Sequence, residues 1–178
     1  MERIYEEVKT PFKYGLVMPG RQGHATDCPT IFRQDGKWYM CYFVYDGRGY
    51  ETGDLSVGIA FTDRDPAAPH EWQRLSAPVL SPRDADVSWW DNDKIYKNSV
   101  IRDPKRLTGH PFVMYYNAKG DCERIGMAVS DDMLHWRRFG ADPVLEHGDR
   151  GIALATSRDM RAKSTFVRWI EEDVMQPR

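Results

Sequence analysis

The 178-residue sequence predicts an all-β fold, and three observations support this prediction. Aromatic residues, which favour strands, make up 12% of the chain and include 6 Trp and 9 Tyr. The 14 Gly and 11 Pro are frequent enough to separate short strands by turns. A series of strand-like segments also occurs twice in the same order. The length fits one domain of ordinary size.

Four strand-like segments make up the first series, and turn residues bound each of them. The first two are joined by Gln34-Asp35-Gly36-Lys37, whose Asp-Gly pair is typical of a tight hairpin turn. A loop of glycines and charged residues, 46–54, follows the second segment. The predicted strands of this series are 29–33, 38–44, 55–61 and 71–75.

The second series repeats the first with changes only in the loops. Gly126-Met127-Ala128 follows Gly58-Ile59-Ala60 by 68 residues, and Pro143-Val144-Leu145 follows Pro78-Val79-Leu80 by 65 residues. A tryptophan lies in the last predicted strand of each series, Trp72 in the first and Trp136 in the second. The strands predicted for the second series are 98–101, 112–116, 125–131 and 134–138.

A repeat of four strands is typical of a β-propeller blade, which buries both of its faces against neighbouring blades. Residues 24–147 supply two blades, whereas propellers have four to eight, so we expect a partial propeller that is truncated after about two blades. We expect residues 1–150 to hold these N-terminal blades. Residues 151–178 predict an atypical C-terminal tail with a short helix near 164–175. An ordinary β-sandwich with chance similarity between its halves is the alternative.

Composition excludes several classes of function. The 25 basic and 27 acidic residues give a net charge of −2, which argues against a nucleic-acid binder. No run of 18 apolar residues predicts a membrane span. The N-terminus has no apolar signal region, so we expect a cytoplasmic protein and leave a secreted full-length relative open. The 3 scattered Cys support neither a zinc site nor a disulfide framework, and no cofactor is expected.

Two stretches carry a resemblance to a known group of enzymes. Residues 24–32 with 36–40, and residues 125–136 with the string Gly-x-Ala-x-Ser-x-Asp before His135-Trp136, resemble the five-bladed propeller glycosidases of glycoside hydrolase family 43 and its arabinanase, levansucrase and invertase relatives. The resemblance covers roughly residues 20 to 150. It implies a partial five-bladed β-propeller that hydrolyses O-glycosidic bonds of poly- or oligosaccharides with paired carboxylates.

The resemblance also implies which acids do the chemistry. In this family, acidic residues stand at the start of the innermost strand of successive blades and face a central funnel. Asp27 precedes the first innermost strand and would be the general base that activates water; the alternative is a turn-capping aspartate. The family's second acid aligns near Ser99, so Asp91 or Asp93, just upstream, would supply that carboxylate, and we choose Asp93. The general acid of the family belongs to a later blade, which in this chain would begin near residue 151, where residues 153–157 hold no carboxylate.

Several further residues are candidate substrate contacts. His24 lies three residues before Asp27, and a tryptophan of the pair Trp89-Trp90 could stack on a sugar ring, for which Trp90 is our candidate. Loop and strand positions near the funnel add hydrogen-bonding groups. The complete set of predicted contacts is His24, Glu51, Trp90, Lys97, Asn98 and Glu123. Solvated loop charges and blade packing are the alternatives for these residues.

Three hypotheses for the function remain open at this point. The first is a glycosidase, with weak or no activity expected of so short a chain. The second is a non-catalytic carbohydrate-binding propeller fragment. The third is a gene fragment without a function of its own, for which the open blade edges predict self-association.

Overall fold

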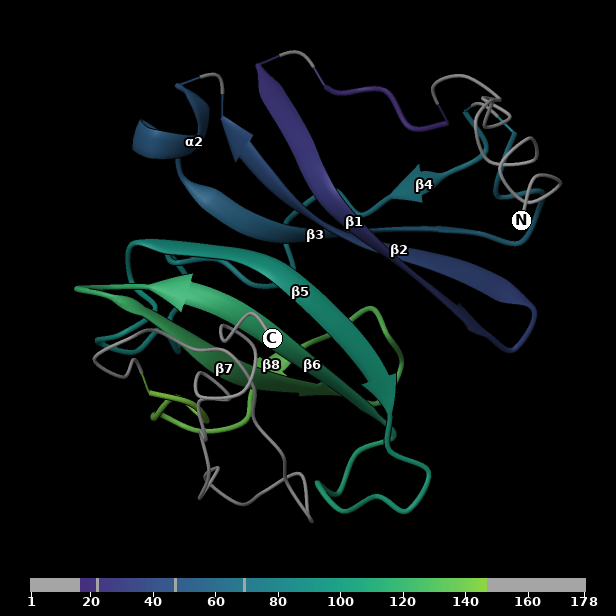
Figure 1. Cartoon of the computed structure of the whole chain (residues 1–178). Helices are drawn as coiled ribbons and strands as arrows, with labels where there is room; N and C mark the ends of the chain where they lie inside the picture. Colours follow the sequence, from purple (N-terminus) through teal and green to yellow (C-terminus); the bar gives the residue numbers. More distant parts are fainter. Residues whose placement is uncertain (1–16, 22, 47, 69, 147–178) are drawn as a thin grey trace, which may run out of the picture.

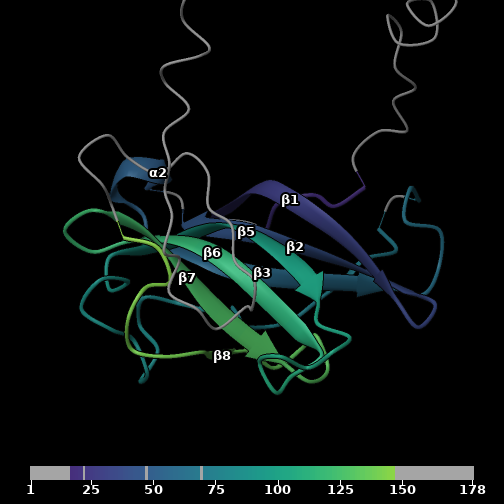
Figure 2. The same cartoon turned by 60° about the horizontal axis from the view of Figure 1, so that its bottom comes forward.

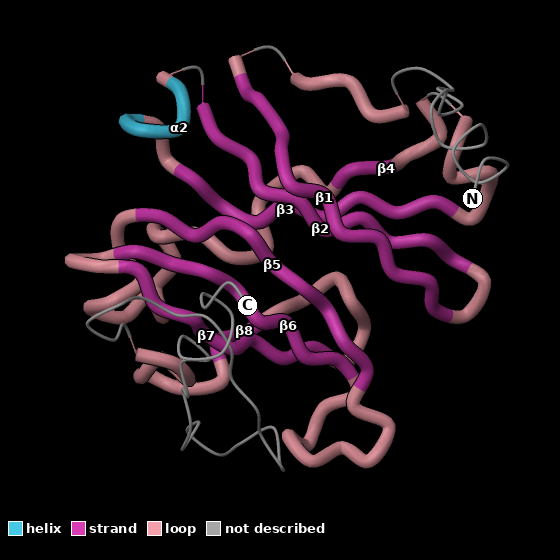
Figure 3. The backbone as a smooth tube through the Cα atoms, in the orientation of Figure 1, coloured by secondary structure: helices cyan, strands magenta, loops and turns pink. Residues whose placement is uncertain are grey.

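The computed structural model describes residues 17–21, 23–46, 48–68 and 70–146, which form two four-stranded antiparallel sheets (Figure 1). In each sheet the strands lie side by side in chain order, so each sheet is one meander, as the tube in Figure 3 shows. The first sheet contains β1 (His24–Gln34), β2 (Lys37–Asp46), β3 (Leu55–Thr62) and β4 (Gln73–Arg74). The second contains β5 (Lys94–Arg102), β6 (Phe112–Lys119), β7 (Glu123–Ser130) and β8 (Arg137–Arg138).

The two sheets correspond to the two halves of the sequence repeat, which confirms the prediction of an all-β, partial propeller fold. Each predicted strand is present, although β1 and β5 begin earlier than expected, at His24 and Lys94. A single turn of helix, α2 (Gly49–Thr52), lies in the loop between β2 and β3 and was not predicted. The predicted tail, residues 151–178, lies outside the described residues.

The predicted hairpin turn between β1 and β2 is present. Gln34 pairs with Lys37, so Asp35 and Gly36 alone form the loop. Asp35 has φ +48° and Gly36 has φ +80°. Two consecutive left-handed residues give a type I′ turn, whose twist matches that of the strands.

The repeated Gly-x-Ala motif has a packing explanation. Tyr42 lies opposite Gly58 in the first sheet, and Tyr116 lies opposite Gly126 in the second. A Cβ added at Gly126 would lie 2.5 Å from Cζ of Tyr116 and 2.3 Å from Cη2 of Trp90, closer than atoms can approach. Each glycine therefore leaves room for a tyrosine ring that lies across the neighbouring strand.

The repeated Pro-Val-Leu segments close each sheet in the same way. Leu80 accepts a hydrogen bond from the backbone N–H of Val57 at 2.9 Å, and Leu145 accepts one from Ile125 at 3.1 Å. Each segment follows the short fourth strand in the sequence. It then pairs with the third strand of its own sheet.

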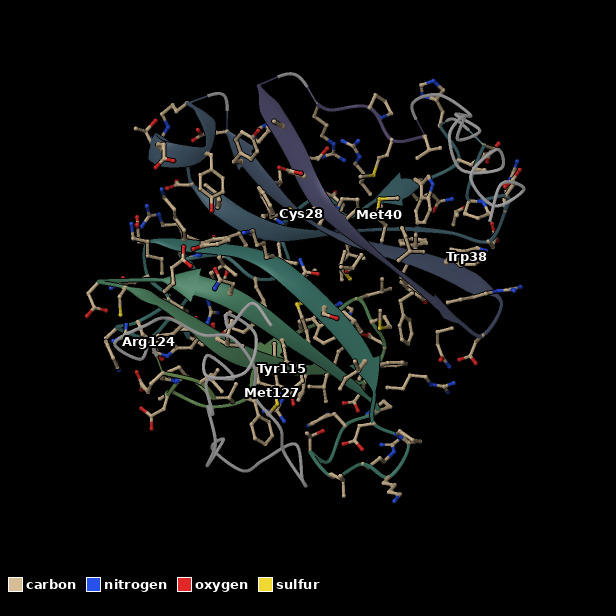
Figure 4. The ribbon with its side chains drawn as sticks, viewed as in Figure 1. Cys28, Trp38, Met40, Tyr115, Arg124 and Met127 are labelled. Carbon is tan, nitrogen blue, oxygen red and sulfur yellow. The ribbon has the colours of Figure 1, made fainter. Side chains whose placement is uncertain are left out.

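The main hydrophobic core holds residues of both sheets, and the second sheet overlaps the first in the view of Figure 2. Alternate residues of β2, such as Tyr39 and Cys41, point toward the second sheet, because successive side chains of a strand point to opposite faces. The opposite faces hold smaller clusters: Trp38 and Met40 belong to the one on the first sheet, and Tyr115 and Met127 to the one on the second (Figure 4). No helix among the described residues is long and apolar enough to cross a membrane.

Candidate functional site

The two inner strands approach each other at equivalent positions of the two blades. Thr30 on β1 donates a hydrogen bond from Oγ1 to Oδ1 of Asn98 on β5, at 3.3 Å. Asn98 follows Thr30 by 68 residues, the same interval that separates the Gly-x-Ala motifs. Both strands are irregular just before this contact, between Asp27 and Thr30 and between Tyr96 and Asn98. Such bulges re-aim side chains and are frequent beside active sites.

Asp27 lies within β1, opposite Phe43, and its side chain is exposed. The backbone N–H of Cys28 donates to Oδ1 of Asp27 at 2.6 Å, which holds the carboxylate against its own strand. Cys28 has a left-handed φ of +46°, so regular pairing stops immediately after Asp27. The strand predicted from the sequence began at Pro29, and the observed strand extends across this interruption to His24.

Lys97 of β5 lies near this turn of β1. Burial, and then the charge of Asp27 and a hydrogen bond to it, raise the pKa of the Cys28 thiol, whereas the charge of Lys97 lowers it. Lys97 of the second blade therefore acts electrostatically on the Asp27–Cys28 turn of the first.

The loops at this end of the two sheets are tied together by side chains of β5. Nζ of Lys94 donates to the carbonyl oxygens of Tyr50 at 3.1 Å and Glu51 at 2.6 Å, both of which lie in α2. The rings of Tyr50 and Tyr96 meet edge to face, with centroids 5.8 Å apart. The hydroxyl of Tyr96 donates to Oε1 of Glu123 at the start of β7. Burial, and then Glu123, raise the pKa of Tyr96.

These contacts place the predicted residues Glu51 and Glu123 at the same end of the two sheets, one on each blade. Both side chains are exposed. Asp93 is also exposed and lies directly before β5, where its backbone N–H donates to the carbonyl of Lys119 at 3.0 Å. The two alternatives for the second carboxylate therefore differ sharply in environment.

Asp91, the other alternative, is fully buried and has a structural role. Its Oδ2 accepts hydrogen bonds from Nε of Arg138 at 2.6 Å and from the hydroxyl of Tyr116 at 3.2 Å. Burial by itself lowers the pKa of Arg138, but the bond and charge of Asp91 outweigh this effect and raise it. Asp91 thus anchors β8 to the start of the second blade, and Asp93 is the accessible carboxylate.

The structure also separates the two adjacent tryptophans, and it corrects the choice of Trp90 as the sugar platform. Trp90 is only 1% exposed, stacks on Tyr116 with centroids 5.8 Å apart, and donates from Nε1 to the carbonyl of Ala141 at 3.0 Å. Its ring faces are therefore occupied by packing. Trp89 is 55% exposed, with the guanidinium of Arg124 4.6 Å from its ring centre. The sequence alone could not separate the two, because burial depends on the fold.

His24 lies apart from the other predicted contacts. It is exposed at the start of β1 and lines a hollow of about 150 Å³ on the outward face of the first sheet, together with Arg21 and Arg74. Lys97, Asn98 and Glu123 line a different hollow, so the structure does not bring His24 together with them.

That second hollow has a volume of about 350 Å³ and lies over β5, β6 and β7. Asn98 is 7% exposed, and its Nδ2 has no hydrogen-bond partner. Oδ1 of Asn117, on β6, is likewise buried without a partner. The lining residues are Lys97, Asn98, Ser99, Tyr115, Tyr116, Asn117, Glu123 and Ile125. Buried polar atoms without partners are uncommon. Asn98 pairs with Tyr116, whose side chain belongs to the core between the sheets, whereas Asn117 lies on the opposite face with Tyr115.

Asn117 was not among the predicted contacts. The alternation of side chains along β6 places it on the same face as Tyr115, which is the signal that could have identified it. In the part of the chain that the structure describes, no group of three or more His, Cys, Asp or Glu side chains could hold a metal ion.

Comparison with solved structures identifies proteins of the same fold. A structure described as a glycoside hydrolase is 31% identical to this chain, with a TM-score of 0.52, and the match covers 84% of this chain and 66% of that one. A GH43 β-xylosidase/α-arabinofuranosidase from a compost microbial metagenome, in complex with xylotriose, is 19% identical, with a TM-score of 0.53 and coverage of 71% and 40%.

A structure from work on the GH130 family of mannoside phosphorylases, which contains glycoside hydrolases that target β-1,2 mannosidic linkages, is 20% identical. Its TM-score is 0.54, and the match covers 71% of this chain and 33% of that one. No protein-family model matches the chain, and no curated protein is similar to it. The chain thus spans from 33% to 66% of the length of these structures. The matches confirm the resemblance to propeller-type glycoside hydrolases and the partial propeller fold.

Proposed function

We propose that this chain, which has the fold of the propeller-type glycoside hydrolases, hydrolyses O-glycosidic bonds of an oligosaccharide or polysaccharide. Asp27 acts as the base and Asp93 as the second carboxylate. The contact between Thr30 and Asn98 carries this proposal, because it brings together the strand that holds Asp27 and the strand that Asp93 precedes.

The chemistry requires two carboxyl groups with different roles. One donates a proton to the leaving oxygen, and the other activates water or attacks the sugar. Asp27 is exposed and is held in place by the N–H of Cys28, which suits a carboxylate that must meet water. Asp93 is exposed at the entrance to β5, which supports its assignment as the second carboxylate. The residue that protonates the leaving oxygen belongs, by the resemblance, to a later blade.

The hollow beside these strands supports a carbohydrate as the substrate. Lys97 contributes a donor, the carboxylate of Glu123 contributes an acceptor, and Ser99 and Tyr115 add hydroxyl groups that can do both. Sugar hydroxyls donate and accept hydrogen bonds, so a mixed lining of this kind can orient a ring without excluding water from it.

Carbohydrate binding without turnover is the second candidate function, and one observation favours it. Among the described residues that line the hollow, Glu123 is the one carboxylate, and the hydroxyl of Tyr96 already binds it. A sugar can therefore bind in the hollow with no acid free to protonate a leaving group.

A panel of aryl glycosides and oligosaccharides tests the two candidates. Hydrolysis is measured for the unmodified chain and for Asp27→Asn, Asp93→Asn and Asp35→Asn. Asp35 is the matched control, because it lies in the hairpin turn at the far end of β1 and its left-handed conformation suits asparagine. We expect Asp27→Asn and Asp93→Asn to lose about 10²–10⁴-fold in turnover and the control to lose none. Equal turnover by Asp27→Asn and the unmodified chain removes Asp27 from the mechanism. Sugar affinity without turnover establishes binding alone.

A further inference from the structure

The two blades carry the same pair of hydrogen-bond donors at equivalent positions. Each blade places a tyrosine opposite the glycine of its Gly-x-Ala motif and an arginine opposite the alanine. These residues are Tyr116 and Arg138 in the second sheet, and Tyr42 and Arg74 in the first. The surroundings of one pair can therefore be compared directly with those of the other.

In the second blade a buried carboxylate joins the two donors. Oδ2 of Asp91 accepts from Nε of Arg138 at 2.6 Å and from the hydroxyl of Tyr116 at 3.2 Å. Asp84 and Asp86 accept further hydrogen bonds from the same guanidinium group. All three aspartates belong to the segment between β4 and β5, which leads into the second blade.

The first blade has the same donors but lacks this carboxylate among the described residues. Arg74 donates to the carbonyl of Pro19, in the segment that leads into its blade, as Arg138 donates to the carbonyl of Ser81. None of the ion pairs found between described side chains includes Arg74. Residues 17–21 of the leading segment contain an arginine and no acidic residue.

A hollow of about 150 Å³ lies beside these donors. Tyr42, Arg74 and Arg21 line it, and none of its lining residues is an aspartate or a glutamate. The ring of Tyr42 is buried and lies across Gly58, which also lines the hollow. Burial raises the pKa of Tyr42, whereas the charges of Arg74 and Arg21 lower it. Both guanidinium groups thus act on the same hydroxyl group.

A second hollow, of about 290 Å³, shares Arg21 and Arg74 with the first. Its lining also contains no aspartate or glutamate. The chain as a whole has slightly more acidic than basic residues, with a net charge of −2. Two neighbouring hollows that contain arginines without acids therefore favour an anion at this place.

We propose that the hollow of about 150 Å³ binds the carboxylate of a small soluble ligand, in the role that Asp91 has in the second blade. The guanidinium groups of Arg74 and Arg21 and the hydroxyl of Tyr42 donate hydrogen bonds to it. Such charge-assisted bonds are roughly twice as strong as neutral ones. The volume is below that of sites for drug-sized molecules, which suits a small carboxylic acid.

This site is separate from the one in the proposed function and does not depend on it. Tyr42 belongs to the hydrophobic cluster on the outward face of the first sheet, whereas Tyr39 and Cys41 of the same strand belong to the core that both sheets share. Binding of a carboxylate here can therefore be tested whether or not the chain hydrolyses glycosides.

Amide chemical-shift titration of the whole isotope-labelled chain with acetate tests the proposal, with chloride replaced so that ionic strength stays constant. We expect saturable shifts at the amides of Tyr42, Gly58 and Arg74, and binding about tenfold or more tighter than that of chloride. Absence of saturable shifts at these amides overturns the proposal. Inorganic phosphate is the second probe, and phosphate that binds as tightly as acetate overturns the assignment of a carboxylate.

Tyr42→Phe tests the hydroxyl group. It keeps the ring across Gly58, so we expect an unfolding temperature close to that of the unmodified chain, and acetate binding weakened about tenfold or more. Tyr45→Phe is the matched control, because it removes a hydroxyl from the same strand but belongs to a different cluster. Equal acetate affinity of the two variants overturns the assignment of Tyr42.

Arg21→Gln tests the second guanidinium group without removing the bond between Arg74 and Pro19. We expect acetate binding to weaken about tenfold, as for the loss of one charged hydrogen bond. Arg102→Gln, at the exposed end of β5 and outside the hollow, is the control and should bind acetate as the unmodified chain does. Unchanged affinity of Arg21→Gln removes Arg21 from the site.

Two other sources of a carboxylate are distinguishable outcomes. Acetate that binds only to the triple variant Glu2→Gln, Glu6→Gln, Glu7→Gln indicates that an acid of the chain itself fills the hollow. Shifts of the same amides on dilution of the protein, without acetate, indicate that a second copy does so. Either result overturns the binding of a soluble ligand.

Discussion

Thr30 of β1 and Asn98 of β5 occupy equivalent positions of the two blades, and a 3.3 Å hydrogen bond joins their side chains. This bond connects the inner strands immediately after the two bulges, where Asp27 and Lys97 lie. It therefore fixes the geometry of the candidate site, and it also fixes which atom of Asn98 is left free.

Removing this bond should weaken the structure as well as the site. We expect Thr30→Val, which keeps the shape of the side chain, to lower the free energy of unfolding by about 1–2 kcal/mol, because Oδ1 of Asn98 loses its donor. Urea denaturation measures the change. Thr52→Val is the control, because the Thr52 hydroxyl donates to the carbonyl of Arg48 at an exposed position, and we expect a change within about 0.5 kcal/mol. Similar effects of the two variants would mean that the bond between the blades contributes little.

Gly126 should tolerate no side chain. Gly126→Ala places a methyl group against the stacked rings of Trp90 and Tyr116, so we expect a loss of about 1–3 kcal/mol in the free energy of unfolding. Gly140→Ala is the matched control, because a Cβ at Gly140 meets no atom within 4 Å. Thermal unfolding of the two variants checks the difference. A Gly126→Ala protein as stable as Gly140→Ala would contradict the packing of the motif.

The buried ion pair of Asp91 and Arg138 should be essential to the second blade. Asp91→Asn leaves the buried guanidinium of Arg138 with Asp84 and Asp86 as its ionised partners among the described residues, and we expect a loss of about 3 kcal/mol in the free energy of unfolding. Asp86→Asn removes a partner whose side chain is 54% exposed, and it should lose about 1 kcal/mol or less. Chemical denaturation compares them, and a larger loss for Asp86→Asn would reverse the assignment of the central partner.

Acid should weaken the turn after β7. Burial raises the pKa of Asp132, but its bonds to His135 and to backbone N–H groups outweigh this effect and lower the pKa to about 2, below its ordinary value of 3.8. The ionised form is therefore favoured in the folded state. Its contribution to stability is fully present above about pH 4 and is lost as the pH falls through about 2.

Denaturation between pH 5 and pH 2 measures this contribution. The unmodified chain should lose more stability over this range than Asp132→Asn does. Asp63→Asn, at an exposed position after β3, serves as the control and should follow the unmodified chain. A parallel pH dependence of Asp132→Asn and the unmodified chain would show that Asp132 is not responsible.

The sequence contains enough information to predict the architecture because the repeat is local and periodic. The Asp35-Gly36 turn, the alternation along β2 and β6, and the paired Gly-x-Ala motifs each follow from short-range chemistry. These features locate all eight strands and the equivalence of the two sheets.

The details of the site depend on tertiary contacts, which the sequence does not show. Trp89 and Trp90 are adjacent and chemically identical, and only the packing of Tyr116 decides which of them is exposed. Because a bulge interrupts β1 at Cys28, the sequence does not indicate where this strand begins. Asn117 can be recognised as a candidate contact only when the hollow that it lines is known. Of the six contacts predicted from their positions near the funnel, Lys97, Asn98 and Glu123 line one hollow in the structure.

The central claim is that sugars bind where the two inner strands meet. Amide chemical-shift mapping of the isotope-labelled chain, titrated with the oligosaccharides of the activity panel, tests it most directly. The account predicts that the largest shifts occur at Asp27, Lys97, Asn98 and Asn117. Shifts that cluster instead around His110 and Arg137, which line a separate hollow at the other end of the second sheet, would contradict it.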